Sequence, residues 1–221
     1  MEHIFIVDVN QLRNPDTFQT HFKCMPKERQ DVIMKYKQED DRLRSLGAGI
    51  VLASILKQYK LDFAQTVLAY GPNGKASVAS RPDIHFNLTH SGNYAAGICG
   101  VSPVGIDVEV LGKLNEKTAK RFFHDGEYRY LMEAEDEEER RVRFFRLWVL
   151  KESFMKATGL GMQLPLNEFE ISFSGQDIGV AQKVDDRTYY FKEFALENSR
   201  MAVCSADRPV AVWEPAWINL C

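Results

Sequence analysis

Two carboxylates stand two positions apart in an otherwise apolar segment that runs from Val104 to Val110. Side chains alternate between the two faces of a β-strand, so Asp107 and Glu109 share one face, about 7 Å apart. Neighbouring carboxylates repel each other unless a cation lies between them, and their hard oxygen atoms suit Mg²⁺. The pair therefore predicts a Mg²⁺ site. The solvent-facing side of an edge strand would show the same pattern.

A third carboxylate, Glu152, interrupts an apolar stripe whose members recur every three or four residues, as on one face of a helix. These members are Phe145, Trp148, Met155 and Gly159. A carboxylate in such a place needs a metal ion, a lysine or a raised pKa. Lys156 follows one turn later, and its ammonium could pair with Glu152 or with a substrate phosphate. A purely structural Glu152–Lys156 pair fits the same spacing.

Several groups of the types that bind phosphate occur before residue 100. Thr89, His90 and Ser91 cluster where a predicted strand ends, Lys75 follows a glycine-rich turn, and Arg44 lies near the start of a predicted helix. Hydroxyls, an imidazole, a lysine and an arginine fork together suit a phosphate. Each alone also fits a structural role, His90 as a turn residue and Arg44 as a surface charge.

The helices and strands that would carry these residues follow from hydrophobic spacing. Helical spacing predicts long helices over residues 40–59 and 143–158 and a short one after Pro26. Period-two alternation predicts a first strand at the N-terminus and a small antiparallel meander in the middle of the chain. The meander strands span residues 84–89, 94–101 and 104–110, and later strands are expected at 169–173, 188–194 and 201–204.

The two halves of the chain share an order, with a strand or loop, then one long helix, then about three short strands. This order predicts an α+β fold of two related halves, residues 1–103 and 104–221, with a ligand crevice between them. An acidic run at residues 133–139 precedes three arginines. Its i,i+4 spacing predicts a solvated helix face, with a partner-docking surface as the alternative. The expected ion pairs are Asp136–Arg140, Glu137–Arg141 and Glu139–Arg143.

Composition excludes several classes of protein. With 28 basic and 31 acidic residues among 221, the net charge is -3, so no global field attracts nucleic acid or anionic lipid. No apolar run approaches the roughly 20 residues of a membrane helix. The cysteines lack metal-ligand spacing and are expected to be reduced core thiols of a cytoplasmic protein. They are Cys24, Cys99, Cys204 and Cys221.

Three motifs in order resemble those of the 4′-phosphopantetheinyl transferases of the surfactin-synthetase-activating type. They are Asn87-Leu88-Thr89-His90-Ser91, Gly105-Ile106-Asp107-Val108-Glu109 and Trp148-Val149-Leu150-Lys151-Glu152-Ser153-Phe154-Met155-Lys156. The resemblance covers nearly the whole chain. It implies a monomeric pseudo-dimer of two α+β halves, with coenzyme A between them and Mg²⁺ on its diphosphate. Mn²⁺ could serve in place of Mg²⁺.

The resemblance also implies a role for each candidate residue. Asp107, Glu109 and Glu152 would hold the metal ion, and Glu152 is the residue expected to act as general base. Asp107 and Lys156 would complete the catalytic set. The implied ligands of coenzyme A are Arg44, Lys75, Thr89 and His90 at its 3′-phosphate, ribose or adenine, and Lys151 and Lys156 at its diphosphate.

The implied reaction is attack by a serine of an apo acyl or peptidyl carrier protein on the β-phosphate of coenzyme A, with 3′,5′-ADP leaving. In such phosphoryl-type transfer, positioning and charge neutralisation do most of the work. Two alternatives stay open, a Mg²⁺-dependent hydrolase of nucleotide-like diphosphates and a non-catalytic module that binds coenzyme A or carrier proteins. Metal-dependent turnover separates an enzyme from a binding module, and dependence on a carrier separates a transferase from a hydrolase.

Overall fold

The computed structural model describes residues 2–208 and 213–220. The helices are α1 (Pro15–Lys23), α2 (Lys27–Lys35), α3 (Glu39–Gln58), α4 (Glu116–Phe122), α5 (Asp125–Met132) and α6 (Glu137–Thr158). The strands are β1 (His3–Asp8), β2 (Leu68–Tyr70), β3 (Ala76–Val78), β4 (His85–Ser91), β5 (Tyr94–Gly100), β6 (Val104–Val110), β7 (Glu170–Ser174), β8 (Asp177–Ala181), β9 (Tyr190–Leu196), β10 (Ser199–Ser205) and β11 (Pro215–Trp217).

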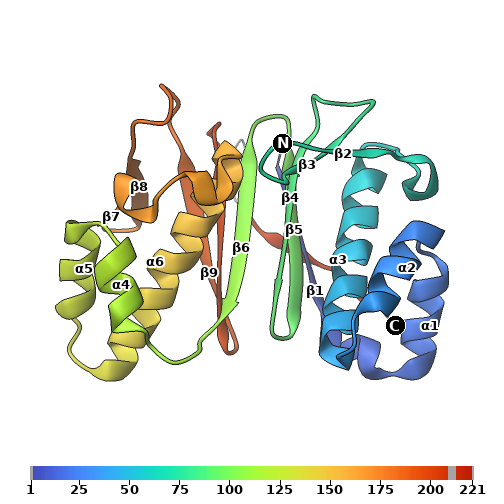
Figure 1. The fold of residues 1–221 in the computed structure, drawn as a ribbon, viewed down its shortest axis with the longest axis horizontal. Coiled ribbons are helices and arrows are strands. Elements are labelled where there is room, and N and C mark those ends of the chain that lie inside the picture. Colours follow the sequence, from blue (N-terminus) through green and yellow to red (C-terminus); the bar gives the residue numbers. More distant parts are fainter. Residues whose placement is uncertain (1, 209–212, 221) are drawn as a thin grey trace.

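Two sheets lie at the centre of the molecule, with one group of helices outside each of them (Figure 1). The first sheet has the strand order β11-β1-β5-β4, and α3 packs against it. The second has the order β6-β10-β9 and is covered by α6. Hairpins β2-β3 and β7-β8 stand apart from both sheets. This arrangement is the α+β architecture that the sequence predicted.

Period-two alternation explains how each central sheet buries both of its faces. In β1, Ile4 and Ile6 contribute to the apolar layer between the two sheets, whereas Phe5 and Val7 pack toward α3. The second sheet repeats the pattern in β10. Its residues Met201 and Val203 join the central layer, and Ala202 and Cys204 join the cluster around α6. The two sheets therefore pack face to face.

The two long helices confirm the helical predictions. α3 begins with three acids, Glu39, Asp40 and Asp41, which favour the positive end of the helix dipole. α6 begins six residues before the predicted start, because the Asp136 side chain caps it by accepting from the Glu139 amide at 2.7 Å. It ends at Gly159, whose φ of 75° closes the last turn.

Only part of the predicted charge pairing around the acidic run forms. Glu139 pairs with Arg143 at 2.7 Å as expected. The other two predicted pairs are wrong, because Arg141 contacts Glu138 and Arg140 contacts Glu116 of α4. Asp136 caps the start of α6 by accepting from the Glu139 amide, and it does not pair with Arg140.

The predicted meander is half correct. β4 and β5 form the antiparallel pair, but β6 pairs along its length with β10, almost a hundred residues away in sequence, rather than with β5. α1 was not predicted, although Asn14 caps it and Pro15 opens it, because none of its residues is buried. Near the C-terminus, β11 returns to the first sheet and pairs in parallel with β1.

Cys99 and Cys204 are buried thiols as expected, whereas Cys24 is exposed and the core prediction is wrong for it. Cys221 lies outside the described residues. No helix within 2–208 and 213–220 is long and apolar enough to cross a membrane.

Candidate active site

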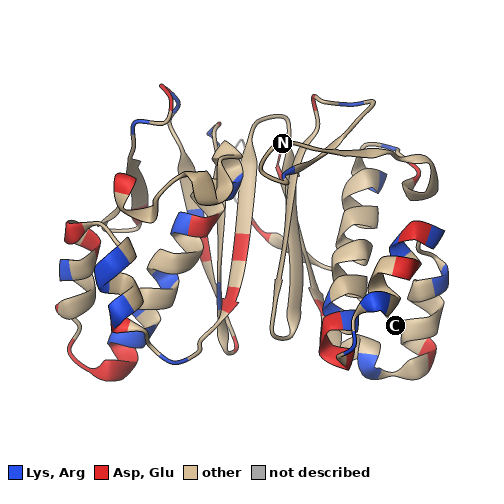
Figure 2. Ribbon diagram, viewed as in Figure 1, with Lys and Arg blue, Asp and Glu red and all other residues tan. Residues whose placement is uncertain are grey.

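The acidic strand β6 lies against α6 with unusually close backbone contact. A Cβ at Gly105 would overlap the carbonyl oxygen of Ser153 and come within 2.5 Å of the amide nitrogen of Ala157. Glycine is therefore required at this position. The close approach brings the carboxylates of β6 next to the side chains of the last two turns of α6, and Figure 2 shows the acidic positions of β6 at the centre of the molecule.

Asp107 is 3% exposed and only partly satisfied. Its Oδ1 accepts from Lys156 Nζ at 2.6 Å and from Thr89 Oγ1 at 3.1 Å. Its Oδ2 is buried and has no hydrogen-bond partner among the described residues. Burial raises the pKa of Asp107, and the Lys156 ammonium opposes that rise. A buried carboxylate oxygen without a donor is costly, so this atom is poised for a ligand.

Glu152 and Glu109 complete a group of three mutually repelling carboxylates. Burial raises the pKa of half-buried Glu152, and the negative charges of Asp107 and Glu109 raise it further. Burial and Asp107 likewise raise the pKa of Glu109, whose Oε2 accepts from Ser91 Oγ at 2.9 Å. The Glu152 side chain makes no hydrogen bond or ion pair with the described part of the chain. Its carboxylate is free to take a proton or bind a cation.

Polar side chains of β4 join the two sheets where their edges meet. The contacts are Asn87 Oδ1 with the Ile106 amide (3.0 Å), Thr89 Oγ1 with the Val108 amide (3.4 Å) and Ser91 Oγ with the Val110 amide (3.3 Å). From one contact to the next, the residue number increases by two on both strands, so β4 and β6 run in the same direction. We call Asn87, Thr89 and Ser91 the β4 polar ladder. It aligns the donors of β4 with the carboxylates of β6.

His90 and Arg44 lie together at the end of β4. The Arg44 guanidinium pairs with Asp41 at 2.5 Å and donates to the Gly92 carbonyl at 3.4 Å. His90 is exposed on its strand, and partial burial, the Arg44 charge and the Lys156 charge all lower its pKa. Thr89, His90, Arg44 and Lys156 thus form one neighbourhood, in which Arg44 pairs with Asp41 and Lys156 pairs with Asp107.

Lys75 does not join that neighbourhood. Its ammonium donates to three carbonyl oxygens, those of Val104 (3.0 Å), Lys156 (2.5 Å) and Ala157 (3.0 Å). The last two belong to the final turn of α6, where carbonyls lack helical partners and the dipole favours a cation. Burial lowers the pKa of Lys75 to about 8. The phosphate role expected for Lys75 stays a prediction, and in this structure its donors are occupied in capping α6.

Lys151 also departs from its expected place. It is fully buried, and its ammonium pairs with the Glu127 carboxylate at 2.5 and 2.6 Å and donates to the Phe169 carbonyl at 2.9 Å. Glu127, itself 1% exposed, further accepts from the His124 and Ile171 amides. Lys151 thus has no access to a diphosphate in this arrangement. Sequence spacing could not reveal this, because its partner lies 24 residues earlier on another helix.

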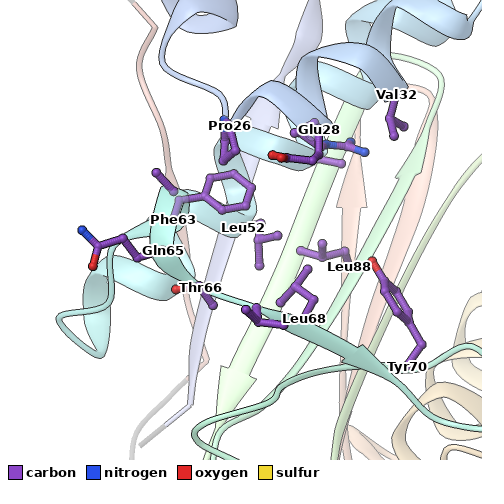
Figure 3. A pocket seen from close by; sticks show the side chains of 14 residues that line it. Pro26, Glu28, Val32, Leu52, Phe63, Gln65, Thr66, Leu68, Tyr70 and Leu88 are labelled. Atoms are coloured by element: carbon purple, nitrogen blue, oxygen red, sulfur yellow. The ribbon is translucent and has the colours of Figure 1, made fainter.

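A largely apolar cavity of about 550 Å³ opens beside the β4 end of the site (Figure 3). α2, α3 and the segment leading into β2 form its walls, with Phe63, Leu52 and Tyr70 facing it. Leu88 reaches it from β4, directly before Thr89. Arg29 also lines the cavity, and its guanidinium donates to the Ser45 carbonyl at 2.5 Å. The cavity can therefore take a flat ring beside Arg29, whose charge also lowers the pKa of His90.

The residues fit a hard divalent cation in chemistry but are not preassembled around one. Asp107, Glu109 and Glu152 supply the oxygen donors that Mg²⁺ prefers, and Asp107 Oδ2 is buried without a partner. In the described part of the chain, however, no group of three or more His, Cys, Asp or Glu side chains is arranged to hold a metal ion. Lys156 occupies Asp107 Oδ1 instead. A diphosphate that attracts Lys156 would release that oxygen.

Two family models match consecutive parts of the chain. The model described as "4'-phosphopantetheinyl transferase, N-terminal" matches residues 13–100. The model described as "4'-phosphopantetheinyl transferase superfamily" matches residues 103–205. The second match contains the three carboxylates and Lys156, and the first contains the β4 polar ladder.

Curated relatives match both parts at once. The chain is 35% identical to 4′-phosphopantetheinyl transferase Sfp of Bacillus subtilis over 184 residues, which cover 82% of this chain and 81% of that protein. It is 35% identical to 4′-phosphopantetheinyl transferase gsp of Aneurinibacillus migulanus, over 81% of this chain and 75% of the relative. Similarity extends to 4′-phosphopantetheinyl transferase HetI of Nostoc, at 38% over 63% of this chain and 60% of the relative.

Proposed function

The chain belongs to the 4′-phosphopantetheinyl transferase superfamily, and we propose that it performs this transfer at the site where β4, β6 and α6 meet. It is a transferase of the Sfp type, which moves the 4′-phosphopantetheine arm of coenzyme A to a carrier protein. The observation that supports this location for the reaction is a group of three carboxylates whose hydrogen-bonding capacity is not filled. Asp107, Glu109 and Glu152 repel one another, and Lys156 pairs with Asp107 at 2.6 Å while its side chain stays 26% exposed.

The proposed reaction begins with the hydroxyl of a carrier-protein serine. Glu152 accepts the hydroxyl proton while the serine oxygen bonds to the β-phosphorus of coenzyme A. The bond between that phosphorus and the bridging oxygen breaks, and 3′,5′-ADP leaves with the electron pair. Burial and two neighbouring negative charges raise the pKa of Glu152, which brings it closer to the range in which a carboxylate is an effective base.

We propose that Asp107, Glu109 and Glu152 hold Mg²⁺, with Mn²⁺ as a substitute. Bound there, the ion would supply charge neutralisation at the diphosphate. Lys156 would serve the same end from the protein, because its side chain is 26% exposed and its ammonium can turn from Asp107 to a phosphate oxygen. The buried Asp107 Oδ2 and the three oxygen donors support this assignment.

Coenzyme A is the phosphopantetheine donor, and we propose that its nucleotide end lies along the start of α3 and the end of β4. His90, Arg44 and Thr89 suit its phosphates, and the neighbouring apolar cavity suits the adenine ring. Lys75 and Lys151 are left out of this set, since their donors are already used. The site draws on residues of both proposed halves, 1–103 and 104–221. We therefore expect one chain to form the whole site and the protein to be monomeric.

The test is an intact-mass measurement of an apo acyl or peptidyl carrier protein after incubation with the protein, coenzyme A and Mg²⁺. The expected result is a carrier that gains one phosphopantetheine arm on its serine, with no gain when EDTA replaces Mg²⁺. A carrier whose target serine is changed to alanine is the matched control. Breakdown of coenzyme A without modification of any carrier would contradict the proposal and favour a hydrolase.

A further inference from the structure

The β4 polar ladder does more than join two sheet edges. Thr89 and Ser91 each use one hydroxyl as donor and acceptor at once, and Thr89 Oγ1 also accepts from Lys156 Nζ at 3.5 Å. Each accepts a backbone amide of β6, and each donates its only proton to a carboxylate of the residue before that amide. Ser91 Oγ lies 2.9 Å from Glu109 Oε2 and 3.3 Å from the Val110 amide nitrogen. Backbone pairing and carboxylate orientation are thus coupled through single oxygen atoms.

The coupling fixes the direction of each hydroxyl proton. A hydroxyl has one donor and two acceptor positions. Because the Val110 amide occupies the acceptor side of Ser91, the proton points to Glu109. The side-chain oxygen that remains, Glu109 Oε1, is left for another ligand. Ser91 is the one hydrogen-bond partner of the Glu109 carboxylate in the described residues, whereas Asp107 has Lys156 as well as Thr89.

We propose that Ser91 is a positioning residue that holds Glu109 in the orientation needed to bind the metal ion. The inference rests on the proposed transferase site and adds to it a residue that has no part in binding coenzyme A there. Without the hydroxyl, repulsion from Asp107 would turn Glu109 away from the other two carboxylates. Hydrogen-bond partners behind metal ligands commonly matter by 10-fold or more in metal affinity or activity.

The chain offers a matched control in Asn87. It is the third member of the ladder, and its Oδ1 accepts the Ile106 amide at 3.0 Å. Its position faces Gly105, which has no side chain, so Asn87 bonds no carboxylate. Replacing Asn87 removes a hydrogen bond between β4 and β6 that is as short as any in the ladder, and it alters no contact with a proposed metal-binding residue. Replacing Ser91 removes a longer hydrogen bond between β4 and β6, the one from the Val110 amide, together with the hydrogen bond to Glu109.

The experiment compares Ser91→Ala with Asn87→Ala. Binding of Mn²⁺ is titrated in the presence of coenzyme A and without a carrier, from the electron paramagnetic resonance signal of the free ion. Thermal unfolding and transfer to an apo carrier are measured on the same samples. For Ser91→Ala we expect Mn²⁺ affinity to fall by about 10-fold and transfer to recover at high Mg²⁺. Asn87→Ala should unfold at an equal or lower temperature than Ser91→Ala, yet bind Mn²⁺ as the unaltered protein does.

Two further results sharpen the test. Ser91→Ala introduced together with Glu109→Gln should weaken Mn²⁺ binding no more than Glu109→Gln alone, because the two changes act through one carboxylate. Ser91→Thr, which keeps the hydroxyl, should restore affinity. Equal Mn²⁺ affinity in Ser91→Ala and the unaltered protein would overturn the inference, as would equal losses in Ser91→Ala and Asn87→Ala. Absence of transfer by the unaltered protein, with the Mn²⁺ effect intact, would instead count against the proposed function alone.

Discussion

Two lysines five residues apart on α6 each pair with a carboxylate from another element, and the surroundings of the two pairs differ completely. Lys151 and Glu127 are both fully enclosed, and every donor and acceptor around them has a partner. Lys156 is 26% exposed, and its partner Asp107 keeps one buried oxygen without a hydrogen bond. The same two chemical groups therefore form a closed contact in one place and an open one in the other.

The difference separates a pair that holds the fold from a pair that can meet a substrate. The closed pair joins α5, α6 and the residues before β7, and it has no free atom to offer. The open pair has both an unpaired oxygen and a lysine side chain that is partly exposed. Charge type alone does not distinguish the two, because the distinguishing property is whether the local hydrogen-bonding capacity is filled.

Breaking the closed pair should have the largest effect on stability. Lys151→Met leaves the Glu127 carboxylate buried without its cation, which we expect to lower the free energy of unfolding by about 3–5 kcal/mol in urea titrations. Lys151→Met combined with Glu127→Gln removes both charges and keeps an oxygen that can accept from the His124 or Ile171 amide, so it should recover much of that loss. The double variant should also transfer phosphopantetheine at close to the normal rate. A stable double variant without activity would place Lys151 in the reaction after all.

Breaking the open pair should act on the reaction instead. Lys156→Met is expected to lower kcat for transfer by about 10²-fold, since one cation is lost from the developing charge. Its stability loss should be smaller than that of Lys151→Met, because Asp107 already has a raised pKa and can take up a proton. Stopped-time transfer assays and urea unfolding measure the two effects. If Lys151→Met and Lys156→Met lost similar amounts of stability and both kept normal transfer, the two pairs would not differ in role.

Lys75 gives the smallest effect and a distinct pH signature. Its pKa is about 8 in the folded protein against an ordinary value of 10.5. Between these values the unfolded chain binds a proton that the folded chain lacks, so this group makes the free energy of unfolding rise with pH. From about pH 7.5 to about pH 9.5 the unaltered protein should gain roughly 1–2 kcal/mol relative to Lys75→Met. A gap in urea stability that stays constant with pH would mean that the α6 carbonyls keep Lys75 charged.

Local patterns in the sequence predicted the elements that carry the site. The spacing of Leu43, Leu46 and Ile50 marks α3, and alternation marks β4 and β6, because these signals depend only on neighbours a few residues away. The pairing of β6 with β10 was missed, since it joins segments far apart in sequence. The same limit applies to α1, whose surface position leaves no hydrophobic signal.

Among the site residues, the carboxylates and Lys156 were recognisable because their types are unusual for an apolar strand and helix. The roles of Lys75 and Lys151 were not, because each is decided by partners from other elements, the last turn of α6 and Glu127. The β4 polar ladder also has a signature in the sequence. Asn87 and Thr89 alternate with Phe86 and Leu88, and Ser91 follows two positions later, so the three polar side chains share one face of β4.

Glu152→Gln tests most directly whether the open carboxylate group performs the reaction. The substitution keeps size and shape and removes a charge that has no ion pair to lose, so folding and coenzyme A binding should be preserved. Intact-mass measurement of an apo carrier under single-turnover conditions is expected to show transfer slowed by about 10³-fold or more. Transfer at the normal rate by folded Glu152→Gln would contradict the account.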